Sequence, residues 1–349
     1  MHKNEKIYDL VINIGRFQPV HNGHMANFKH SAKIGKHVVA ILGSMDQART
    51  PVNPFIFSER KEMLQALMPS IIVRGVRDYL YNNNTWISQV NAIVDEEVKN
   101  LGLENPKIAI MGYEKDETSW YIRAFPQWTF ESIGGYCEVG GAVVDATRIR
   151  QLYFQEHFGF LKGVVPDQVY DWLMAFSKTE HFVDMQQEQE FYATYKKQWS
   201  FAPYPVQFNT VDAVVVQGGH VLLIQRKAYP GRGLWALPGG FVNPNETCVD
   251  GMIRELREET KIKVPEVVLR SSITHEKLFD HPDRSLRGRT FTMAYLIELV
   301  SGDASLPKVK GSDDAAVAKW FTENEVMSMS DQLFDDHFSI LSYMFARTK

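Results

Sequence analysis

Short apolar, β-branched runs alternate with segments of helical periodicity through the first half of the chain, from Ile7 to about Leu161. Three of these runs are typical of strands: Tyr8 to Ile14, His37 to Leu42 and Lys107 to Met111. Between the first two, Met25, Phe28 and Ala32 follow the i, i+3, i+7 spacing of a helix that packs one apolar stripe on a sheet. Strands separated by such helices pair in parallel, so this half is predicted to be a doubly wound α/β domain.

The second half of the chain has a different pattern. Strands are predicted at three places, and one strong helix lies between them: Val211 to Val216, Val221 to Gln225 and Thr290 to Leu299, with the helix from Thr247 to Thr260. This order indicates an α+β domain with a mixed sheet. The segment between the halves is charged and glutamine-rich, and it ends in FAPYPVQ with two prolines. We therefore expect domains at 1–183 and 205–349, joined by a linker at 184–204.

Composition agrees with two folded domains. The chain has 349 residues, which exceeds the size at which one hydrophobic core usually stops growing. Apolar residues make up 44% and charged residues 23%, as in ordinary globular domains. A formal net charge of -4 argues against wholesale binding to nucleic acid.

The sequence also bears on the compartment. Cys137 and Cys248 lie far apart and in no metal-ligand spacing, so neither a disulfide framework nor a zinc site is expected. No apolar run approaches the roughly 20 residues that cross a bilayer, and the first apolar run is too short for a signal peptide. We expect a cytoplasmic protein without membrane contact. Association into a homo-oligomer stays open, because nothing in the sequence decides it.

The first candidate site follows the first predicted strand directly. The string GRFQPVHNGH, from Gly15 to His24, lies between that strand and the first helix. In an open α/β sheet, ligands bind beyond the carboxyl ends of strands, where a helix N-terminus offers free N–H groups to phosphate. Gly15 and Gly23 allow close approach of the backbone, Arg16 adds a positive fork, and His21 and His24 add two donors.

Two histidines near a helix start are often merely solvated or structural, but the complete string narrows the choice. GRFQPVHNGH resembles the HxGH signature of the nucleotidyltransferase superfamily, and in particular the archaeal-type nicotinamide mononucleotide (NMN) adenylyltransferases. This resemblance implies a Rossmann-like fold in which His21 and His24 bind the phosphates of ATP. It also assigns ATP contacts to the rest of the loop: Gly15, Arg16, Phe17, Gln18 and Gly23.

Three further segments carry the same resemblance. NNNTW is similar to the family segment in which a tryptophan stacks on the nicotinamide ring, which implies NMN contacts from Asn83, Asn84 and Trp86, although Trp86 as a core residue is an alternative. MGYEKDETSWY and DATRIR resemble segments that bind the nucleotide and its triphosphate. The ATP contacts that they imply are Gly112, Lys115, Asp116, Thr147, Arg148 and Arg150.

The last of these segments departs from the family at one position. Ala146 stands where relatives often have serine or glycine, so a side-chain contact is lost there. Thr147 is expected to cap the following helix, and Arg150 to hold the triphosphate. Adenylyl transfer needs positioning and charge neutralisation more than covalent chemistry, so His21, His24 and Arg150 are predicted to stabilise the departing pyrophosphate, with Mg²⁺ bridging its oxygens.

The second candidate site lies on the helix of the second domain. Glu255, Glu258 and Glu259 are spaced i, i+3 and i+4, so three carboxylates share one helical face. Like charges on adjacent turns are unfavourable unless a cation holds them, and carboxylate oxygens suit Mg²⁺ or Mn²⁺. A solvated acidic face is the alternative. A neighbouring apolar stripe would anchor the helix to a sheet: Val249, Ile253 and Leu256.

The surrounding string favours the metal site. GFVNPNETCVDGMIRELREETKI, preceded by LPGG, resembles the Nudix box at every position but one. Lys261 occupies the place of the glycine that normally ends the helix in a left-handed conformation, at a cost of about 1 kcal/mol. By resemblance Glu258 and Glu259 ligate metal, Glu255 is a ligand or orients water, and Arg254 fixes the glutamates through an ion pair.

The resemblance implies further contacts around the box. Gly240 is the remaining expected metal contact, and ADP-ribose contacts are expected from four residues: Trp235, Gly239, Gly240 and Arg254. Trp235 could instead fill the core. Asp313 and Asp314, in a predicted loop, are candidates for the additional acid that some relatives use.

Together the halves resemble a family of bifunctional bacterial enzymes that join an NMN adenylyltransferase to a Nudix ADP-ribose pyrophosphatase. The implied ligands are ATP, NMN, NAD and ADP-ribose, with Mg²⁺, or Mn²⁺, in both domains. Two alternatives stay open. The second domain could cleave NADH or a dinucleoside polyphosphate, or it could sense NAD metabolites without catalysis.

Overall fold

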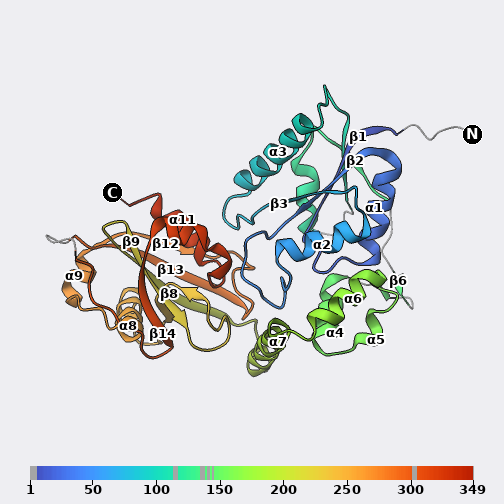
Figure 1. The fold of residues 1–349 in the computed structure, drawn as a ribbon. Helices are drawn as coiled ribbons and strands as arrows, with labels where there is room; N and C mark the ends of the chain where they lie inside the picture. The colour runs from blue at the N-terminus through green and yellow to red at the C-terminus, as the bar shows by residue number, and fades with distance from the viewer. Residues whose placement is uncertain are drawn as a thin grey trace, which may run out of the picture. The chain divides into compact units, whose positions relative to one another are not determined.

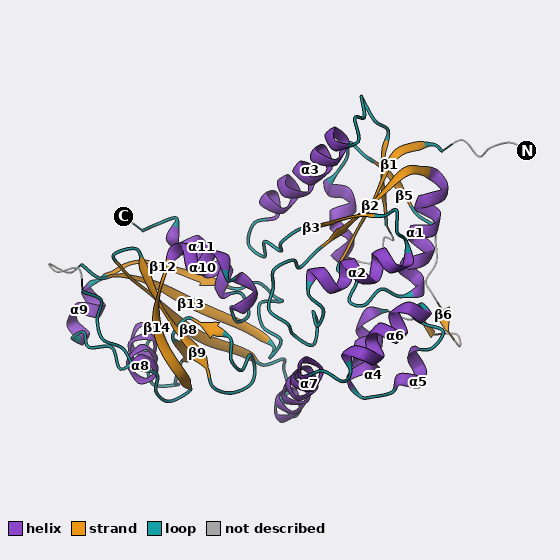
Figure 2. Ribbon diagram, viewed as in Figure 1, coloured by secondary structure: helices purple, strands orange, loops and turns teal. Residues whose placement is uncertain are grey.

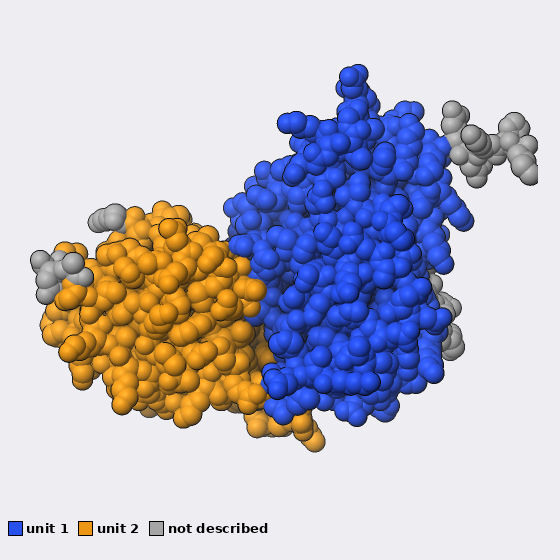
Figure 3. All heavy atoms as spheres, in the orientation of Figure 1, with its two compact units in different colours: residues 1–187 blue, residues 188–349 orange. Residues whose placement is uncertain are grey.

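The computed structural model describes residues 6–112, 117–133, 138–139, 142–143, 145–300 and 305–348. The chain divides into two compact units, residues 1–187 and 188–349 (Figure 3). The division falls within helix α7 (Glu180–Gln198), which occupies most of the segment expected as a linker. Within these described ranges, no helix combines the length and the hydropathy that a membrane span requires.

Unit 1 is built on a five-stranded parallel sheet in the order β3-β2-β1-β4-β5 (Figure 1). Its strands are β1 (Tyr8–Gly15), β2 (Gly35–Leu42), β3 (Ile72–Gly75), β4 (Ile108–Met111) and β5 (Thr129–Glu131). The connecting helices are α1 (Asn22–Ile34), α2 (Phe57–Leu67) and α3 (Asn83–Asn100), with a 3₁₀ helix η1 (Glu117–Ala124) and a short antiparallel pair, β6 (Glu138–Val139) and β7 (Ala142–Val143). The doubly wound α/β prediction is confirmed.

The sheet of unit 1 is covered on both faces, which explains why β1 is apolar at consecutive positions. Leu10, Val11 and Ile12 are all fully buried. The predicted stripe of α1 packs against one face through Met25 and Phe28. Helix α3 packs against the opposite face, where it shares a hydrophobic cluster with Leu10 and Ile12 of β1.

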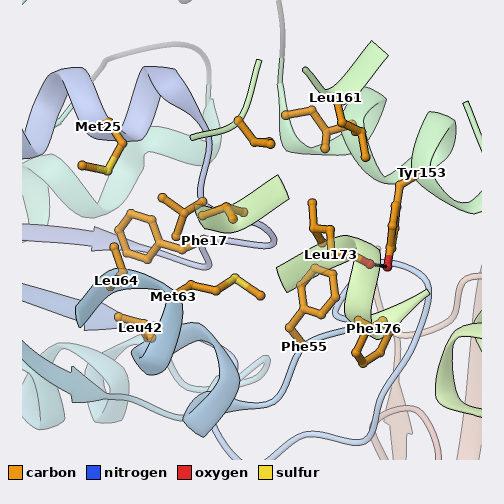
Figure 4. Close-up of a cluster of buried hydrophobic side chains, with 14 of the residues drawn as sticks. Phe17, Met25, Leu42, Phe55, Met63, Leu64, Tyr153, Leu161, Leu173 and Phe176 are labelled. Atoms are coloured by element: carbon orange, nitrogen blue, oxygen red, sulfur yellow. Dashed lines mark hydrogen bonds between the residues drawn. The ribbon is translucent and has the colours of Figure 1, made fainter. Parts of the chain in front are cut away.

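The end of unit 1 is helical: α4 (Ala146–Phe154), α5 (Phe158–Leu161), α6 (Asp167–Phe176) and the first part of α7. This layer shares one core with α1, α2 and β2 (Figure 4). Phe55 and Phe176 pack edge to face, with ring centroids 5.2 Å apart. The buried hydroxyl of Tyr153 donates to the Leu173 carbonyl at 2.7 Å, which satisfies its polar atom within the core. The core therefore fixes α4, which carries Arg150, relative to the loop after β1.

Unit 2 is an α+β domain with a mixed seven-stranded sheet (Figure 2). Its path is β10-β9-β8-β13-β12, with β11 paired to β8 and β14 paired to β9. The strands are β8 (Gln207–Gln217), β9 (His220–Arg226), β10 (Trp235–Ala236), β11 (Gly239–Phe241), β12 (Ile273–Phe279), β13 (Arg289–Glu298) and β14 (Ala315–Thr322). Strands β8 and β13 are parallel, and the other pairs are antiparallel, so the predicted mixed sheet is confirmed.

The helices of unit 2 are α8 (Cys248–Thr260), α9 (Glu266–Ser271), α10 (Glu323–Ser328), the 3₁₀ turn η2 (Ser330–Gln332) and α11 (His337–Phe345). Helix α8 is the helix predicted between Thr247 and Thr260. Ile253 and Leu256 of α8 are buried against Val211 and Ala213 of β8. This packing leaves the acidic face of α8 beside β11 and the loop that precedes it.

Two candidate nucleotide sites

The loop after β1 is held by buried main-chain hydrogen bonds. The Gly43 N–H donates to the Gly15 carbonyl at 3.0 Å, which joins the ends of β1 and β2. The fully buried guanidinium of Arg60 donates at 2.7 Å to the carbonyls of both Arg16 and Gly43. Carbonyls buried in a loop need such donors, so Arg60 fixes the path of the backbone at the carboxyl edge of the sheet. The sequence patterns did not single out Arg60, because its function depends on carbonyls distant in the chain.

A cavity of about 350 Å³ opens at this edge, between the ends of β1 and β4 and the starts of α1 and α4. Eight of the predicted ATP contacts line it: Gly15, Arg16, Phe17, Gln18, His24, Gly112, Thr147 and Arg150. Asn13, Asn27 and Tyr121 also line it and were not predicted. Lys115 and Asp116 lie outside the described residues.

The two histidines of the first site form a stacked pair at the start of α1. Their ring centroids are 3.7 Å apart, and His24 Nδ1 accepts the His21 main-chain N–H at 3.3 Å. His24 also meets the edge of Phe17, a buried residue with φ of 52°. Of the pair, His24 lines the cavity and His21 does not. A left-handed, non-glycine residue such as Phe17 is strained, and such strain is common at binding sites.

The electrostatics of the pair favour neutral rings. Burial lowers the pKa of His21 to about 4 and, together with His21, holds the pKa of His24 well below its usual range. Both rings are therefore uncharged at neutral pH. Since Nδ1 of His24 accepts a hydrogen bond, Nε2 carries the ring proton and is free to donate to an anionic oxygen.

Arg150 contributes the buried positive charge at this cavity. It is 5% exposed, Nη1 donates to the Gln18 carbonyl at 2.7 Å, and Nη2 donates to the Thr147 hydroxyl at 3.3 Å. Burial and the nearby Arg16 lower the pKa of Arg150 to about 10, so it stays charged at neutral pH. Two cations at one cavity indicate an anionic ligand.

One of the sequence expectations is wrong at this point. The cap of α4 is made by Asp145, whose side chain accepts the Arg148 N–H at 2.8 Å, and Thr147 lies inside the helix. The expectation that Thr147 caps the helix was therefore wrong. The side-chain amide of Gln18 pairs with both main-chain groups of Phe55, at 2.8 and 3.0 Å, so it shapes the loop.

The predicted nicotinamide residues lie at the start of α3. Trp86 is half-buried, and its ring packs against two other aromatic rings. The ring centroids of Trp120 and Tyr121 lie 5.5 Å and 6.3 Å from that of Trp86. Since Tyr121 lines the phosphate cavity, Trp86 lies one ring away from it. Asn83 and Asn84 are exposed in the first turn of the helix. Trp86, Trp120 and Tyr121 thus form an aromatic cluster next to the cavity, of a kind suited to stacking on a flat ring.

The second site is organised by Arg254 of α8. Its guanidinium donates to Glu246 at 2.7 Å, to Glu255 at 2.8 Å and to Glu258 at 3.1 Å. It also donates to the Phe241 carbonyl at 3.1 Å. One arginine therefore fixes three carboxylates and the end of β11, which bidentate guanidinium geometry allows.

Strand β11 contacts two carboxylates of α8, Glu259 and Glu255, directly. The Gly239 N–H donates to Glu259 at 2.9 Å. A Cβ at Gly240 would lie 2.4 Å from Glu255 Oε1, so a side chain at this position would displace the Glu255 carboxylate. Burial raises the pKa of Glu259 to about 8 and raises the pKa of Glu255. The hydrogen bonds and ion pairs of the protein alone therefore do not offset the cost of burying these two carboxylates in their charged forms.

The donor set fits a hard divalent cation, although the side chains do not converge as they stand. Among the described residues no group of three acidic, histidine or cysteine side chains closes on one point. Glu255 and Glu258 form ion pairs with Arg254, and Glu259 accepts a hydrogen bond from the Gly239 N–H. A cation near Glu259 and Glu255 would stabilise the charged forms that burial penalises, and oxygen ligands suit Mg²⁺ or Mn²⁺.

Three other residues that the sequence singled out at this site lie in different surroundings. Trp235 of β10 is half-buried and meets the edge of Phe321 at 4.7 Å. Asp313 lies close enough to Glu255 to raise the pKa of that carboxyl. Lys261 ends α8 with φ of 47° and ψ of 31°, the left-handed conformation in which glycine is favoured.

These features define two classes of site in one chain: a nucleotidyltransferase-type phosphate cavity on a parallel sheet, and a Nudix-type acidic helix on a mixed sheet. The comparison with known families agrees. The chain belongs to the cytidylyltransferase-like family, whose model matches residues 12–187, and it carries a NUDIX domain, which is matched by residues 207–343.

Each half resembles characterised proteins. Residues of unit 1 are 27% identical to a nicotinamide/nicotinic acid mononucleotide adenylyltransferase of Acinetobacter baylyi, over 52% of this chain and 93% of that protein. An ADP-ribose pyrophosphatase of Methanocaldococcus jannaschii is 32% identical over 38% of this chain and 71% of its own length.

Solved structures also resemble nearly the whole chain. One of them is a bifunctional NMN adenylyltransferase/ADP-ribose pyrophosphatase from Francisella tularensis, crystallised with AMP and a manganese ion. It is 33% identical, covers 97% of this chain and 99% of its own, and superposes with a TM-score of 0.87.

Proposed function

We propose that this protein is a bifunctional enzyme of NAD metabolism. Unit 1 transfers the adenylyl group of ATP to NMN, giving NAD and pyrophosphate. Unit 2 hydrolyses ADP-ribose to AMP and ribose 5-phosphate. The proposal depends on one observation: the chain contains both kinds of site. Unit 1 has a cavity lined by His24 and Arg150, and unit 2 has a Nudix helix. The chain is similar over 97% of its length to one bifunctional enzyme.

In unit 1 the chain supplies binding and charge. His24 Nε2 donates to the triphosphate, and Arg150 neutralises its charge at the cavity. The phosphate of NMN attacks the α-phosphorus of ATP, the bond to the β-phosphate oxygen breaks, and pyrophosphate leaves. No side chain transfers a proton in this step, since the attacking phosphate is already ionised.

The acceptor of unit 1 is held on the aromatic cluster. Trp86 stacks on the nicotinamide ring, and it is placed for this by its contact with Tyr121, whose ring centroid lies 6.3 Å away and which lines the cavity. Asn83 and Asn84, exposed in the first turn of α3, supply amide groups for the carboxamide.

In unit 2 the carboxylates hold a cation and a water. Glu258, Glu259 and the Gly240 carbonyl are the proposed ligands, and Glu255 orients the attacking water. A divalent cation, when bound, neutralises charge on the diphosphate and makes water a better nucleophile. Arg254 keeps Glu255 and Glu258 in place through its paired hydrogen bonds. We propose Mg²⁺ as the cation in both units, with Mn²⁺ as a substitute.

The proposal is tested by product analysis with the whole protein. ATP and NMN with Mg²⁺ should give NAD and pyrophosphate in equal amounts. ADP-ribose with Mg²⁺ or Mn²⁺ should give AMP and ribose 5-phosphate, and a chelator should stop the reaction. Faster cleavage of NADH or a dinucleoside polyphosphate would replace ADP-ribose as the substrate, and cation-independent binding without cleavage would make unit 2 a sensor.

A further inference from the structure

The segment that leads into α11 lies against the loop that precedes the Nudix helix. Leu333 forms a parallel bridge with Trp235, and the Phe334 N–H donates to the Trp235 carbonyl at 2.9 Å. Two residues further along, the Leu237 N–H donates to Nδ1 of His337 at 2.8 Å. A stretch from the end of the domain therefore pairs with the stretch that enters the LPGG loop.

His337 is held firmly enough to act as a fixed acceptor. It is 6% exposed at the first position of α11. The preceding residue, Asp336, forms a buried, double hydrogen bond with Arg284, at 2.8 and 3.0 Å. This pair anchors the start of α11 and so helps to fix the position of the His337 ring.

The ring reaches the strand beneath the loop as well. His337 Nε2 lies 3.8 Å from Asp212 Oδ1, and Asp212 is the partner of Gly239 in the ladder between β8 and β11. The Ala213 N–H donates to the Pro238 carbonyl at 2.8 Å. Leu237 and Pro238 are thus bonded from two directions, immediately before the glycines that contact the catalytic carboxylates.

The consequence of this arrangement lies at Glu259 and Glu255. The Gly239 N–H donates to Glu259, and Gly240 lies so close to Glu255 that a Cβ there would displace the Glu255 carboxylate. A shift of the loop by a few tenths of an ångström would move both glycines against these carboxylates. Without an acceptor, the buried Leu237 N–H would lose its hydrogen bond. This loss costs free energy, which a shift of the loop would reduce.

We propose that His337 is a positioning residue for the Nudix site, which fixes the LPGG loop through the Leu237 N–H and so sets the geometry in which Gly240 and Glu259 hold a divalent cation. This inference rests on the proposed function of unit 2. His337 itself touches neither substrate nor cation. Substitution of residues that orient metal ligands without touching the metal lowers metal affinity or activity by about 10- to 100-fold.

The test compares three variants of the full chain. His337→Leu removes the acceptor at similar volume. His337→Asn keeps an acceptor oxygen near the place of Nδ1. Ile340→Ala, at a fully buried position one turn further along α11, creates a cavity without touching the loop and controls for general destabilisation. The measurements are the dissociation constant of Mn²⁺ by electron paramagnetic resonance, hydrogen exchange of residues 235–241, and kcat and KM for ADP-ribose.

The expected result is that His337→Leu weakens Mn²⁺ binding by about 10-fold or more, speeds exchange in residues 235–241 and lowers kcat, while His337→Asn stays close to wild type. Ile340→Ala should bind Mn²⁺ as the wild type does. Unchanged Mn²⁺ binding and exchange in His337→Leu, or equal weakening in Ile340→Ala, would overturn the inference. A wild type that binds Mn²⁺ but leaves ADP-ribose intact would overturn the proposed hydrolysis alone, because Mn²⁺ binding and exchange still test the role of His337.

Discussion

Arg150 donates a 2.7 Å hydrogen bond to the main-chain carbonyl of Gln18, and so joins the start of α4 to the loop after β1. The two residues are 132 positions apart in the sequence. Through this bond Arg150, which we propose to neutralise the triphosphate, also fixes the loop after β1. The loop after β1 and the start of α4 therefore form one hydrogen-bonded assembly, whose parts should fail together.

Arg150→Lys tests this double role. A lysine has one compact ammonium, which cannot reach the Gln18 carbonyl and a phosphate with fixed geometry at once. We expect kcat for NAD formation to fall by about 100-fold, as for loss of a transition-state donor. Pyrophosphate release measures it. Arg74→Lys is the matched control, since Arg74 pairs with Glu97 away from the cavity, and equal losses in the two variants would contradict the assignment.

Trp86→Ala should separate the two substrates of unit 1. Loss of a stacked ring costs about 1–3 kcal/mol, so the KM for NMN should rise about 10-fold or more while the KM for ATP changes little. Initial rates with each substrate varied in turn provide the measurement. Trp86→Phe keeps a flat ring and should retain most of the affinity. If both KM values rose together, Trp86 would serve the core formed with Phe125 and not the acceptor.

Lys261→Gly should stabilise unit 2 without changing its chemistry. Lys261 has a φ of 47°, and a glycine in this conformation avoids the strain of a Cβ, which is worth about 0.5–1 kcal/mol. Urea denaturation should show the gain, with the rate of ADP-ribose hydrolysis unchanged. Lys261→Ala removes the same charge but keeps the Cβ. A comparable gain in that variant would assign the effect to charge.

Glu259→Gln should change stability in a pH-dependent way. Burial raises the pKa of Glu259 in the folded state to about 8, from a usual value of 4.5, so the folded state binds this proton more tightly than the unfolded chain does. The stability that it contributes is complete below about pH 4.5 and is lost as the pH rises towards about 8. The glutamine keeps an oxygen for the Gly239 N–H.

In a chelating buffer, unit 2 of Glu259→Gln should therefore be more stable than wild type by about 1–3 kcal/mol near pH 8, and by little near pH 5. Thermal unfolding at the two pH values checks this. Glu246→Gln is the control of opposite sign, because its hydrogen bonds from Arg254 lower the pKa of Glu246 to about 2. A stability difference for Glu259→Gln that does not vary with pH would show that its charge is already compensated.

The sequence predicted the elements that have strong local patterns. The buried run of β1 and the stripe of Met25 and Phe28 gave the parallel sheet, and the spacing of Glu255 to Glu259 placed three carboxylates on α8. Strands β10 and β11 have two and three residues, so they carry too little pattern to predict. They form because β9 and β8 offer free edges in the folded domain.

Residues that act over long separations were beyond the sequence patterns. Arg60 bonds carbonyls that lie 44 and 17 positions away, and His337 bonds an N–H 100 positions away. Nothing local distinguishes such residues from ordinary buried or exposed ones. The cap of α4 shows the same limit on a smaller scale, since either Asp145 or Thr147 suits an N-cap and only the backbone conformation decides between them.

The most direct test of the central claim, two independent nucleotide sites in one chain, is a crossed product assay of His24→Ala and Glu258→Gln. Each full-length variant is given ATP with NMN, and separately ADP-ribose, both with Mg²⁺. We predict that His24→Ala loses most NAD formation but hydrolyses ADP-ribose as the wild type does, and that Glu258→Gln shows the reverse. Loss of both activities in each variant, or near-normal NAD formation in His24→Ala, would contradict the account.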